Sequence, residues 1–249
     1  MNYKYNIVNP SILKKIIKLS CYITDYCYLY LDENTIKMVV KDNIDKYQMI
    51  YTLYTKKNSE TNKNNENNND RINIIYKINL FSLKKIFNKI KVNELDNFNL
   101  TFTNDKLLIS VINQLQNSLY CIFVEKSIEI DGILSLTNNQ ENDYLNIDIY
   151  NLYQILYHIK DLDEMPLKIT LYQNILQVDF YHLNYKGNIT KKLKDNYPFD
   201  RLEIDINKDI FLKILKLNTI NHIGKLYKLD NYNIIEINNK DCNLRFIYK

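Results

Sequence analysis

Glycine is almost absent from this chain of 249 residues, which contains only Gly132, Gly187 and Gly224. Loops that cradle a nucleotide phosphate need glycines at fixed spacing, as in GxGxxG or in GxxxxGK followed by Ser or Thr. Glycines this far apart form neither pattern. A phosphate-binding loop of either type is therefore excluded.

Histidine is equally scarce, and no catalytic pattern surrounds it. His158, His182 and His222 fall in separate predicted elements, each without a carboxylate or thiol at motif spacing. A general base has to lie within hydrogen-bond reach of its partner, so we interpret these as incidental surface or half-buried histidines. No nucleophile with an adjacent base stands out either. We expect a protein that is not an enzyme and that needs no cofactor or metal.

Two further groups of candidate metal ligands are better explained without a metal. Asp161, Asp163 and Glu164 cluster after a predicted helix, where a solvated turn is far commoner than a metal site. The cysteines form no CxxC pair and have no histidine at zinc-ligand spacing. We expect them to be reduced residues in strands and helix ends: Cys21, Cys27, Cys121 and Cys242.

The overall composition is that of a soluble protein. Tryptophan is absent while Asn, Ile, Lys and Tyr dominate, which we attribute to an AT-rich genome. The net charge of +4 is mild, so the placement of lysine matters more than its number. No signal-peptide pattern and no apolar run of membrane-spanning length occur. We therefore expect a soluble, intracellular chain of one or two domains.

The sequence does contain a unit of strand and helix that recurs four times, and such self-similarity is best considered first. The helical segments begin 70, 69 and 59 residues apart: Leu13–Ile17, Leu83–Phe87, Leu152–Leu156 and Phe211–Leu215. An alternating strand and an asparagine precede each helix: Asn9, Asn79, Asn151 and Asn207. Two or three alternating strands follow it. This order predicts an α+β protein in which short helices cover antiparallel sheets.

Each predicted helix has one apolar face. In the first helix that face consists of Leu13, Ile16, Ile17 and Ser20, and in the second of Leu83, Ile86, Phe87 and Ile90. The third helix has the same apolar pattern, Leu152, Ile155, Leu156 and Ile159, but carries Tyr153 and Tyr157 opposite it. Lysines gather on the opposite face of the first two helices and, less regularly, of the fourth.

Lysines on neighbouring helices are suited to contacts with a polyanion backbone that read no base sequence. Lysine tolerates such contacts because its ammonium needs no fixed geometry. A solvated helix face without a ligand is the alternative interpretation. The residues predicted to face DNA are Lys14, Lys15, Lys18, Lys84, Lys85, Lys89, Lys91, Lys160, Lys213 and Lys216.

The repeats group into two halves. Residues 1–124 form the first predicted domain and residues 144–249 the second, each with two repeats, and residues 125–143 form a connector between them. Residues 56–70 are polar and rich in asparagine, so we predict a disordered insert in a surface loop of the first domain.

Five segments carry a family resemblance through their order and spacing: Met1–Asn9, Asn99–Lys106, Ile128–Ile133, Leu202–Lys208 and Leu244–Tyr248. Together they resemble the sliding-clamp family, and within it the Hus-type subunit of the Rad9–Rad1–Hus checkpoint clamp more than the replicative clamp, the proliferating cell nuclear antigen. The resemblance covers nearly the whole chain. It implies a DNA-clamp fold of two similar domains, with antiparallel sheets outside and four helices on the inner face.

The resemblance also implies a function. Such a chain is one third of a ring around double-stranded DNA, together with Rad9-type and Rad1-type subunits. A clamp loader places the ring at damaged or stalled DNA in the nucleus, where it recruits checkpoint and repair proteins. The nearest alternative is a homotrimeric replicative clamp. A protein-interaction scaffold of duplicated α+β modules, without DNA contact, is a more remote one.

Two kinds of contact surface follow from the resemblance. The ring closes through edge strands, here Asn117–Val124 and Lys186–Leu193, whose interface residues are Ser118, Tyr120, Ile122, Val124, Lys186, Asn188, Thr190 and Lys192. Partner peptides dock beside the connector, on Ile128, Ile130, Ile133, Leu134 and Leu136. For the connector residues, plain packing onto the core is the alternative. The insert at 56–70 and the tyrosines of the third helix depart from the family pattern.

Overall fold

A computed structural model describes residues 3–32, 34–42, 47–56, 74–90, 97–112, 117–127, 144–163, 165–193, 201–217, 223–229, 232–238 and 242–248. The chain divides into two compact units. Unit 1 consists of Met1–Asn43, Gln48–Asp131 and Lys240–Asn243, and unit 2 of Ile44–Tyr47, Gly132–Asn239 and Leu244–Lys249. The predicted insert, apart from Lys56, and all but the first residues of the predicted connector lie outside the described residues.

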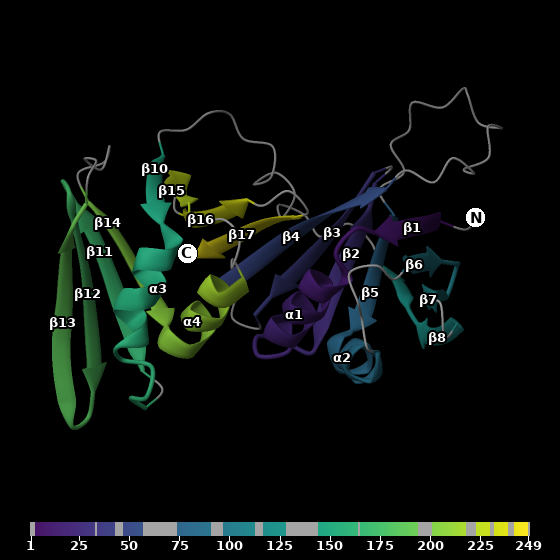
Figure 1. The fold of residues 1–249 in the computed structure, drawn as a ribbon, viewed down its shortest axis with the longest axis horizontal. Helices are drawn as coiled ribbons and strands as arrows, with labels where there is room; N and C mark the ends of the chain where they lie inside the picture. Colours follow the sequence, from purple (N-terminus) through teal and green to yellow (C-terminus); the bar gives the residue numbers. More distant parts are fainter. Residues whose placement is uncertain are drawn as a thin grey trace. The chain divides into compact units, whose positions relative to one another are not determined.

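Unit 1 is built on one antiparallel sheet (Figure 1). Its strands are β1 (Tyr3–Ile7), β2 (Tyr26–Leu31), β3 (Thr35–Lys41), β4 (Tyr47–Lys56), β5 (Ile74–Asn79), β6 (Asn97–Phe102), β7 (Lys106–Ile112), β8 (Asn117–Phe123) and β9 (Glu125–Ser127). Their order is β8-β7-β6-β1-β4-β3-β2-β5-β9. The helices are α1 (Pro10–Ser20) and α2 (Leu80–Lys89).

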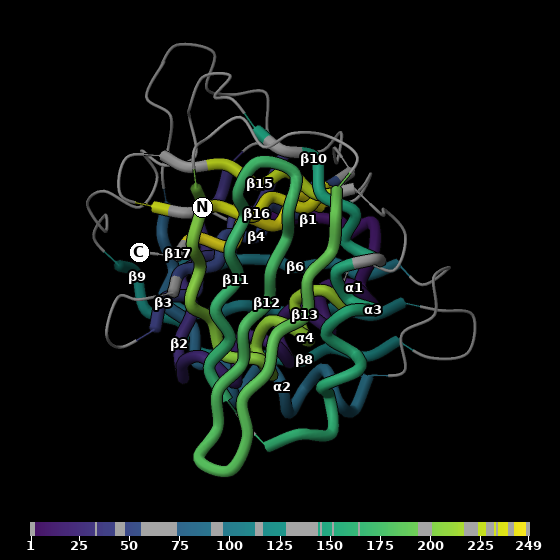
Figure 2. The backbone as a smooth tube through the Cα atoms, turned by 90° about the vertical axis from the view of Figure 1, so that its left-hand side faces the viewer, coloured from purple at the N-terminus to yellow at the C-terminus, as the bar shows by residue number. Residues whose placement is uncertain are grey.

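Unit 2 has the same alternation of strands and helices, and its described strands form two groups of antiparallel neighbours. The strands are β10 (Leu145–Asp148), β11 (Pro166–Tyr172), β12 (Ile175–His182), β13 (Tyr185–Lys192), β14 (Leu202–Asn207), β15 (Ile223–Leu229), β16 (Tyr232–Asn238) and β17 (Cys242–Tyr248). They are ordered β13-β12-β11-β14 and β10-β15-β16-β17. Figure 2 shows the long strands of the first sheet side by side. The helices are α3 (Ile149–Tyr157) and α4 (Lys208–Leu217).

Asparagine side chains start three of the four described helices, as predicted. The Oδ1 of Asn9 accepts from the Ile12 amide at 3.2 Å, that of Asn79 from the Ser82 amide at 2.9 Å, and that of Asn207 from the Asp209 amide at 2.9 Å. These bonds satisfy amides that have no partner inside the helix. The prediction was wrong for Asn151, which lies in the first turn of α3, because β10 runs directly into that helix at Ile149.

The predicted apolar faces are confirmed. Leu13, Ile16, Ile17 and Ser20 of α1 are all buried, as are Leu83, Phe87 and Ile90 in and directly after α2. In α3 and the turn after it, Leu152, Leu156 and Ile159 are buried. Ile86 and Ile155 are half-buried. The helices pack in pairs within each unit, α1 with α2 and α3 with α4.

A buried ammonium joins the helices of unit 2. Lys208, the first residue of α4, is fully buried. Its Nζ donates to three backbone carbonyls in the turn after α3, those of Lys160 at 3.3 Å, Asp163 at 3.1 Å and Leu162. The Asp209 carboxylate lies 3.7 Å away. These carbonyls belong to the turn beyond the last residue of α3, so the first residue of α4 supplies the donor that holds the turn leaving the other helix.

Lys208→Met should therefore lower the free energy of unfolding by about 2 to 4 kcal/mol, because three part-buried carbonyls lose the buried ammonium that donates to them while the apolar stem is kept. Lys216→Met, at an exposed lysine of the same helix, is the matched control and should change it by less than about 0.5 kcal/mol. Urea unfolding followed by circular dichroism measures both. Equal stability of the two variants would contradict the capping role.

Candidate nucleic-acid interface

The lysines of α1 and α2 divide into exposed and engaged residues. The exposed ones are Lys15, Lys18, Lys85 and Lys89. Lys14 is half-buried, and its Nζ donates to the Ile90 carbonyl, just after α2, at 3.0 Å. Burial, with a smaller contribution from Lys18, lowers the pKa of Lys14. Lys14 therefore joins the two helices, and the four exposed lysines remain the stronger candidates for binding a polyanion.

Aromatic rings accompany the lysines of unit 1. Lys84 is half-buried, with its Nζ 5.8 Å from the ring centroid of Tyr22, and the Nζ of Lys85 lies 4.5 Å from that of Phe81. Tyr22 is 60% exposed and Phe81 57% exposed. An ammonium is attracted to the face of an aromatic ring. The helix side of unit 1 thus offers both charge and flat apolar surface.

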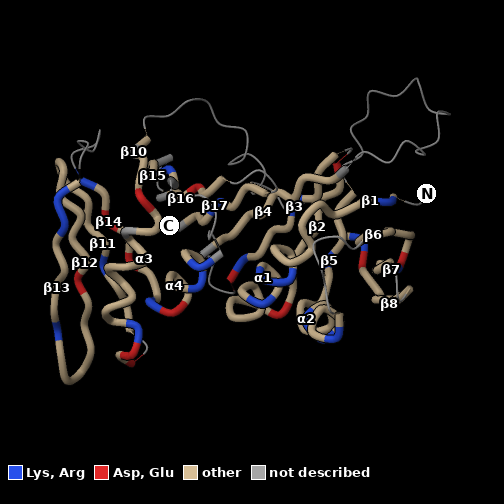
Figure 3. Tube along the Cα trace, in the orientation of Figure 1, with Lys and Arg blue, Asp and Glu red and all other residues tan. Residues whose placement is uncertain are grey.

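Basic residues are fewer on the helices of unit 2. Figure 3 shows no charged position along α3, whereas α1, α2 and α4 carry lysines. Lys160 follows α3, and its Nζ lies 3.6 Å from the ring centroid of Tyr157. A hydrogen bond to Tyr157 is the largest cause that raises the pKa of Lys160. On α4, Lys213 is half-buried and Lys216 exposed. Lys91, the remaining predicted contact, lies outside the described residues.

The strands predicted to close a ring are end strands of their sheets in the described part of the chain. β8 pairs only with β7, and β13 only with β12. An unpaired strand edge presents backbone donors and acceptors that a neighbouring chain can complete. The placement of both strands is thus suited to assembly, although their side chains differ strongly.

The outward side of β8 is apolar. Leu119 is 69% exposed and Phe123 76% exposed, with Cys121 exposed between them. Of the predicted interface residues, Ser118 and Tyr120 are half-buried, and Ile122 and Val124 are buried in unit 1. Alternation along a strand puts these two sets on opposite faces. Sequence reasoning missed the outward set because both sets contain large apolar residues.

The outward side of β13 is polar and basic. Its exposed residues are those predicted for the interface: Lys186, Asn188, Thr190 and Lys192. The alternate residues, which include Ile189, are half-buried. The residues predicted for the peptide groove, Ile128, Ile130, Ile133, Leu134 and Leu136, all lie outside the described residues.

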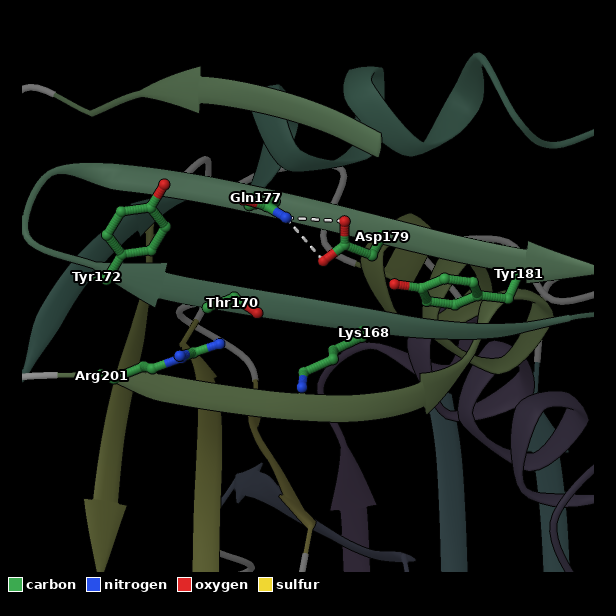
Figure 4. Close-up of a pocket in the computed structure, with 7 residues that line it drawn as sticks. All are labelled: Lys168, Thr170, Tyr172, Gln177, Asp179, Tyr181 and Arg201. Carbon is green, nitrogen blue, oxygen red and sulfur yellow. Dashed lines mark hydrogen bonds between the residues drawn. The ribbon is translucent and has the colours of Figure 1, made fainter. Parts of the chain in front are cut away.

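A shallow cavity of about 490 Å³ lies on the outward side of β11, β12 and the start of β14 (Figure 4). Its lining residues are Lys168, Thr170, Tyr172, Gln177, Asp179, Tyr181 and Arg201. The Gln177 amide donates to both carboxylate oxygens of Asp179, at 2.8 and 2.9 Å. Lys168 pairs with Glu203 at 3.1 Å and lowers the pKa of that carboxyl. Asp179 is therefore paired with Gln177, and Lys168 with Glu203. Among the residues that line the cavity, none is a nucleophile with an adjacent base.

His182 contacts Tyr185 and Asp163, one of the acidic residues after α3. His182 stacks on Tyr185, with ring centroids 4.7 Å apart, and its Nε2 lies 3.7 Å from the Asp163 carboxylate. The Asp163 amide donates to the Tyr185 hydroxyl at 3.1 Å. These contacts fasten the turn after α3 to the β12–β13 hairpin. His158 and Asp161 are exposed, while His222 and Glu164 lie outside the described residues.

The remaining features considered in the sequence are the cysteines, possible metal ligands and possible membrane spans. The four cysteines, all in the described part of the chain, form no disulfide; one lies directly after α1 and the others in β2, β8 and β17. The described residues contain no cluster of His, Cys, Asp and Glu that could hold a metal ion. None of the described helices is both long and apolar enough to span a membrane.

Comparison with known proteins relates the fold to one architecture. No protein-family model matches the sequence, and no curated protein does. The crystal structure of proliferating cellular nuclear antigen from Entamoeba histolytica matches with a TM-score of 0.72, covering 98% of this chain and 97% of that chain at 13% sequence identity. The α+β clamp fold predicted from the sequence, with antiparallel sheets and four helices, is therefore confirmed.

If the exposed helix lysines contact phosphates, Lys15→Glu with Lys85→Glu should weaken binding to a short DNA duplex and make its salt dependence shallower. The slope of log K against log salt should fall by about 2, because each lost phosphate contact removes roughly 0.9. Fluorescence anisotropy at several salt concentrations measures this slope. Lys4→Glu with Lys126→Glu changes the net charge by the same amount, at exposed residues of two strands, and should leave the slope unchanged. An equal effect of both pairs would contradict a localised interface.

Proposed function

We propose that this chain is a non-catalytic subunit of a ring-shaped clamp that encircles double-stranded DNA. The clamp fold along 98% of the chain supports this, together with the exposed lysines of α1, α2 and α4. A fold alone does not specify a function, and these lysines and the two sheet edges are the features that support this one.

The lysines suit a clamp better than a sequence-specific DNA-binding protein. Lys15, Lys18, Lys85 and Lys89 are exposed on the regular helices of unit 1. Contacts of this kind neutralise phosphates without reading bases, and a few of them bind weakly at physiological salt. Weak and non-specific contacts let a ring that is held by topology move along the duplex.

The sheet edges provide the means of ring closure. Within the described residues, β8 ends the sheet of unit 1 and β13 ends a sheet of unit 2. When the edge of one subunit adds to the edge of the next, one sheet continues across the boundary and no edge remains exposed. Head-to-tail contacts of this kind close into a ring when the rotation between subunits permits it.

The contrast between the two edges is the observation that favours a ring of different chains. β8 displays Leu119 and Phe123, whereas β13 displays Lys186 and Lys192. In a homotrimer the apolar edge of one copy would have to join the basic edge of the next, which would bury the ammonium groups of β13 beside the aliphatic Leu119. The Phe123 ring could accept a cation, but the Nζ of Lys106 already lies 5.6 Å from its centroid. Partners with their own matching edges avoid this mismatch. We infer that the neighbours are a Rad9-type and a Rad1-type subunit.

The checkpoint role follows from this assembly as part of the proposal. A clamp loader places the ring on damaged or stalled DNA in the nucleus, and the ring recruits checkpoint and repair proteins. The chain itself supplies no chemistry. A homotrimeric replicative clamp is the second candidate, favoured by the fold likeness to the Entamoeba histolytica antigen.

The state of the purified chain in solution separates these two assemblies. Light scattering should give a mass near the monomer value of 30.0 kDa. The tagged chain, purified from its own cells, should bring down two different chains in equal amounts, identified by mass spectrometry. A single species of three times 30.0 kDa, about 90 kDa, from the chain alone would instead establish the replicative alternative.

Phe123→Asp should reduce the recovery of one partner, because it places a carboxylate on the apolar edge of β8. Ile112→Asp is the matched control, since Ile112 is also exposed but lies on β7, which is not an end strand. Quantitative pull-down measures both variants. Equal recovery of both partners with Phe123→Asp would rule out β8 as an assembly edge.

A further inference from the structure

The outward side of α3 carries tyrosines where α1 and α2 carry lysines. Tyr150, Tyr153 and Tyr157 are three and four residues apart, so they lie along one side of the helix. Tyr150 is 53% exposed, Tyr157 is 41% exposed and Tyr153 is half-buried. We call these three residues, with Lys160 beyond them, the tyrosine stripe.

The stripe is not part of the core. Ile149, Leu152 and Leu156 fill the buried side of α3 and are at most 2% exposed. The tyrosines lie next to that side and leave much of their ring surface in water. Burying aromatic rings is among the larger apolar gains open to a side chain. The partly exposed rings of this row therefore present apolar surface that a bound ligand would bury.

The rings and the ammonium form one continuous surface. The ring centroids of Tyr153 and Tyr157 are 5.7 Å apart, with the planes tilted by 48°. The Nζ of Lys160 lies 3.6 Å from the centroid of Tyr157. Aromatic faces with a cation at one end match a ligand that has flat rings and phosphates. Lys213 and Lys216 on α4, which packs beside α3, add positive charge, against Asp161 next to Lys160.

The same combination of ring and ammonium occurs in unit 1. Phe81 lies beneath Lys85 and Tyr22 beneath Lys84. Both rings are more than half exposed. Both helix pairs therefore combine exposed rings with ammonium groups, and the tyrosine stripe is the longest such row. A protein partner could also cover exposed rings, but it would not require an ammonium beside the rings in both units.

We propose that the tyrosine stripe binds unpaired bases of single-stranded nucleic acid, with the rings of Tyr153 and Tyr157 stacking on bases and Lys160 pairing with a phosphate. Stacking on aromatic side chains is tolerant of sequence, because every base has a π-face. Bases inside a duplex are already stacked on one another and do not offer these faces. The stripe would therefore distinguish single strands from duplex, which the lysines of α1 and α2 do not.

This inference does not require the proposed ring. The stripe lies on one helix, so the full-length chain alone should show the activity. Fluorescence anisotropy with a labelled oligothymidylate of about 20 nucleotides, longer than the sites of single-strand-binding folds, measures it. An abasic oligonucleotide of equal length has the same phosphates without bases, and a duplex of equal length has paired bases.

The wild-type chain should bind oligothymidylate about tenfold or more tightly than the abasic strand, because stacking adds affinity for each base. Tyr153→Leu with Tyr157→Leu should remove that difference and leave duplex binding unchanged. Tyr153→Phe with Tyr157→Phe keeps the rings and should retain it. Tyr181→Leu, at a tyrosine of β12 that is 52% exposed, is the control for general loss of aromatic surface.

A second readout does not depend on a variant that folds. Irradiation of the wild-type chain with an oligonucleotide containing 5-iodouracil should cross-link Tyr153 or Tyr157, identified by mass spectrometry. The proposal is overturned if wild-type chain binds oligothymidylate and the abasic strand equally, if the leucine pair keeps the difference, or if the cross-links map elsewhere. Equal loss of duplex and single-strand binding in the leucine pair would also overturn it, since the stripe would then contact only the backbone.

Discussion

Burial of one apolar stripe on each helix is the constraint on which the rest of this structure depends. The stripe of α1, Leu13 to Ser20, and that of α3, Leu152 to Ile159, leave only the opposite side of each helix for other chemistry. Because the helices are short, that side holds only a few residues. Its lysines and tyrosines therefore account for most of what the helices offer to a ligand.

Lysine serves two different purposes on these helices. Lys14 and Lys208 use their ammonium groups to satisfy backbone carbonyls at the end of the neighbouring helix, at Ile90 in unit 1 and after α3 in unit 2. They join the pairs on which the exposed lysines are displayed. In both units a lysine of one helix donates to carbonyls that follow the other helix. In unit 1 this lysine lies inside α1, and in unit 2 it is the first residue of α4. A net charge of +4 gives no indication of this division.

Periodic features could be predicted from the sequence, and contacts between distant residues could not. The apolar faces and the caps at Asn9, Asn79 and Asn207 follow from local pattern, whereas the end strands were expected from the resemblance to the clamp family. Nothing local marked Lys208 as buried, because its acceptors are more than forty positions away in sequence. Likewise, Gly224 matters because a Cβ there would meet the Ile149 side chain at 2.7 Å, so a larger residue would force that side chain of α3 to shift. The tyrosines of α3 were seen in the sequence, but their exposure was not.

Encirclement of DNA can be tested with a circular plasmid, because a closed ring cannot leave DNA that has no ends. The complex purified from cells should be loaded onto a covalently closed plasmid, washed in high salt and then exposed to a restriction enzyme that cuts the plasmid once. The account predicts that the complex stays on the circle through the salt wash, which screens the lysine contacts, and leaves once the DNA has ends. Equal retention on circular and linear DNA, or loss from the circle in salt, would contradict it.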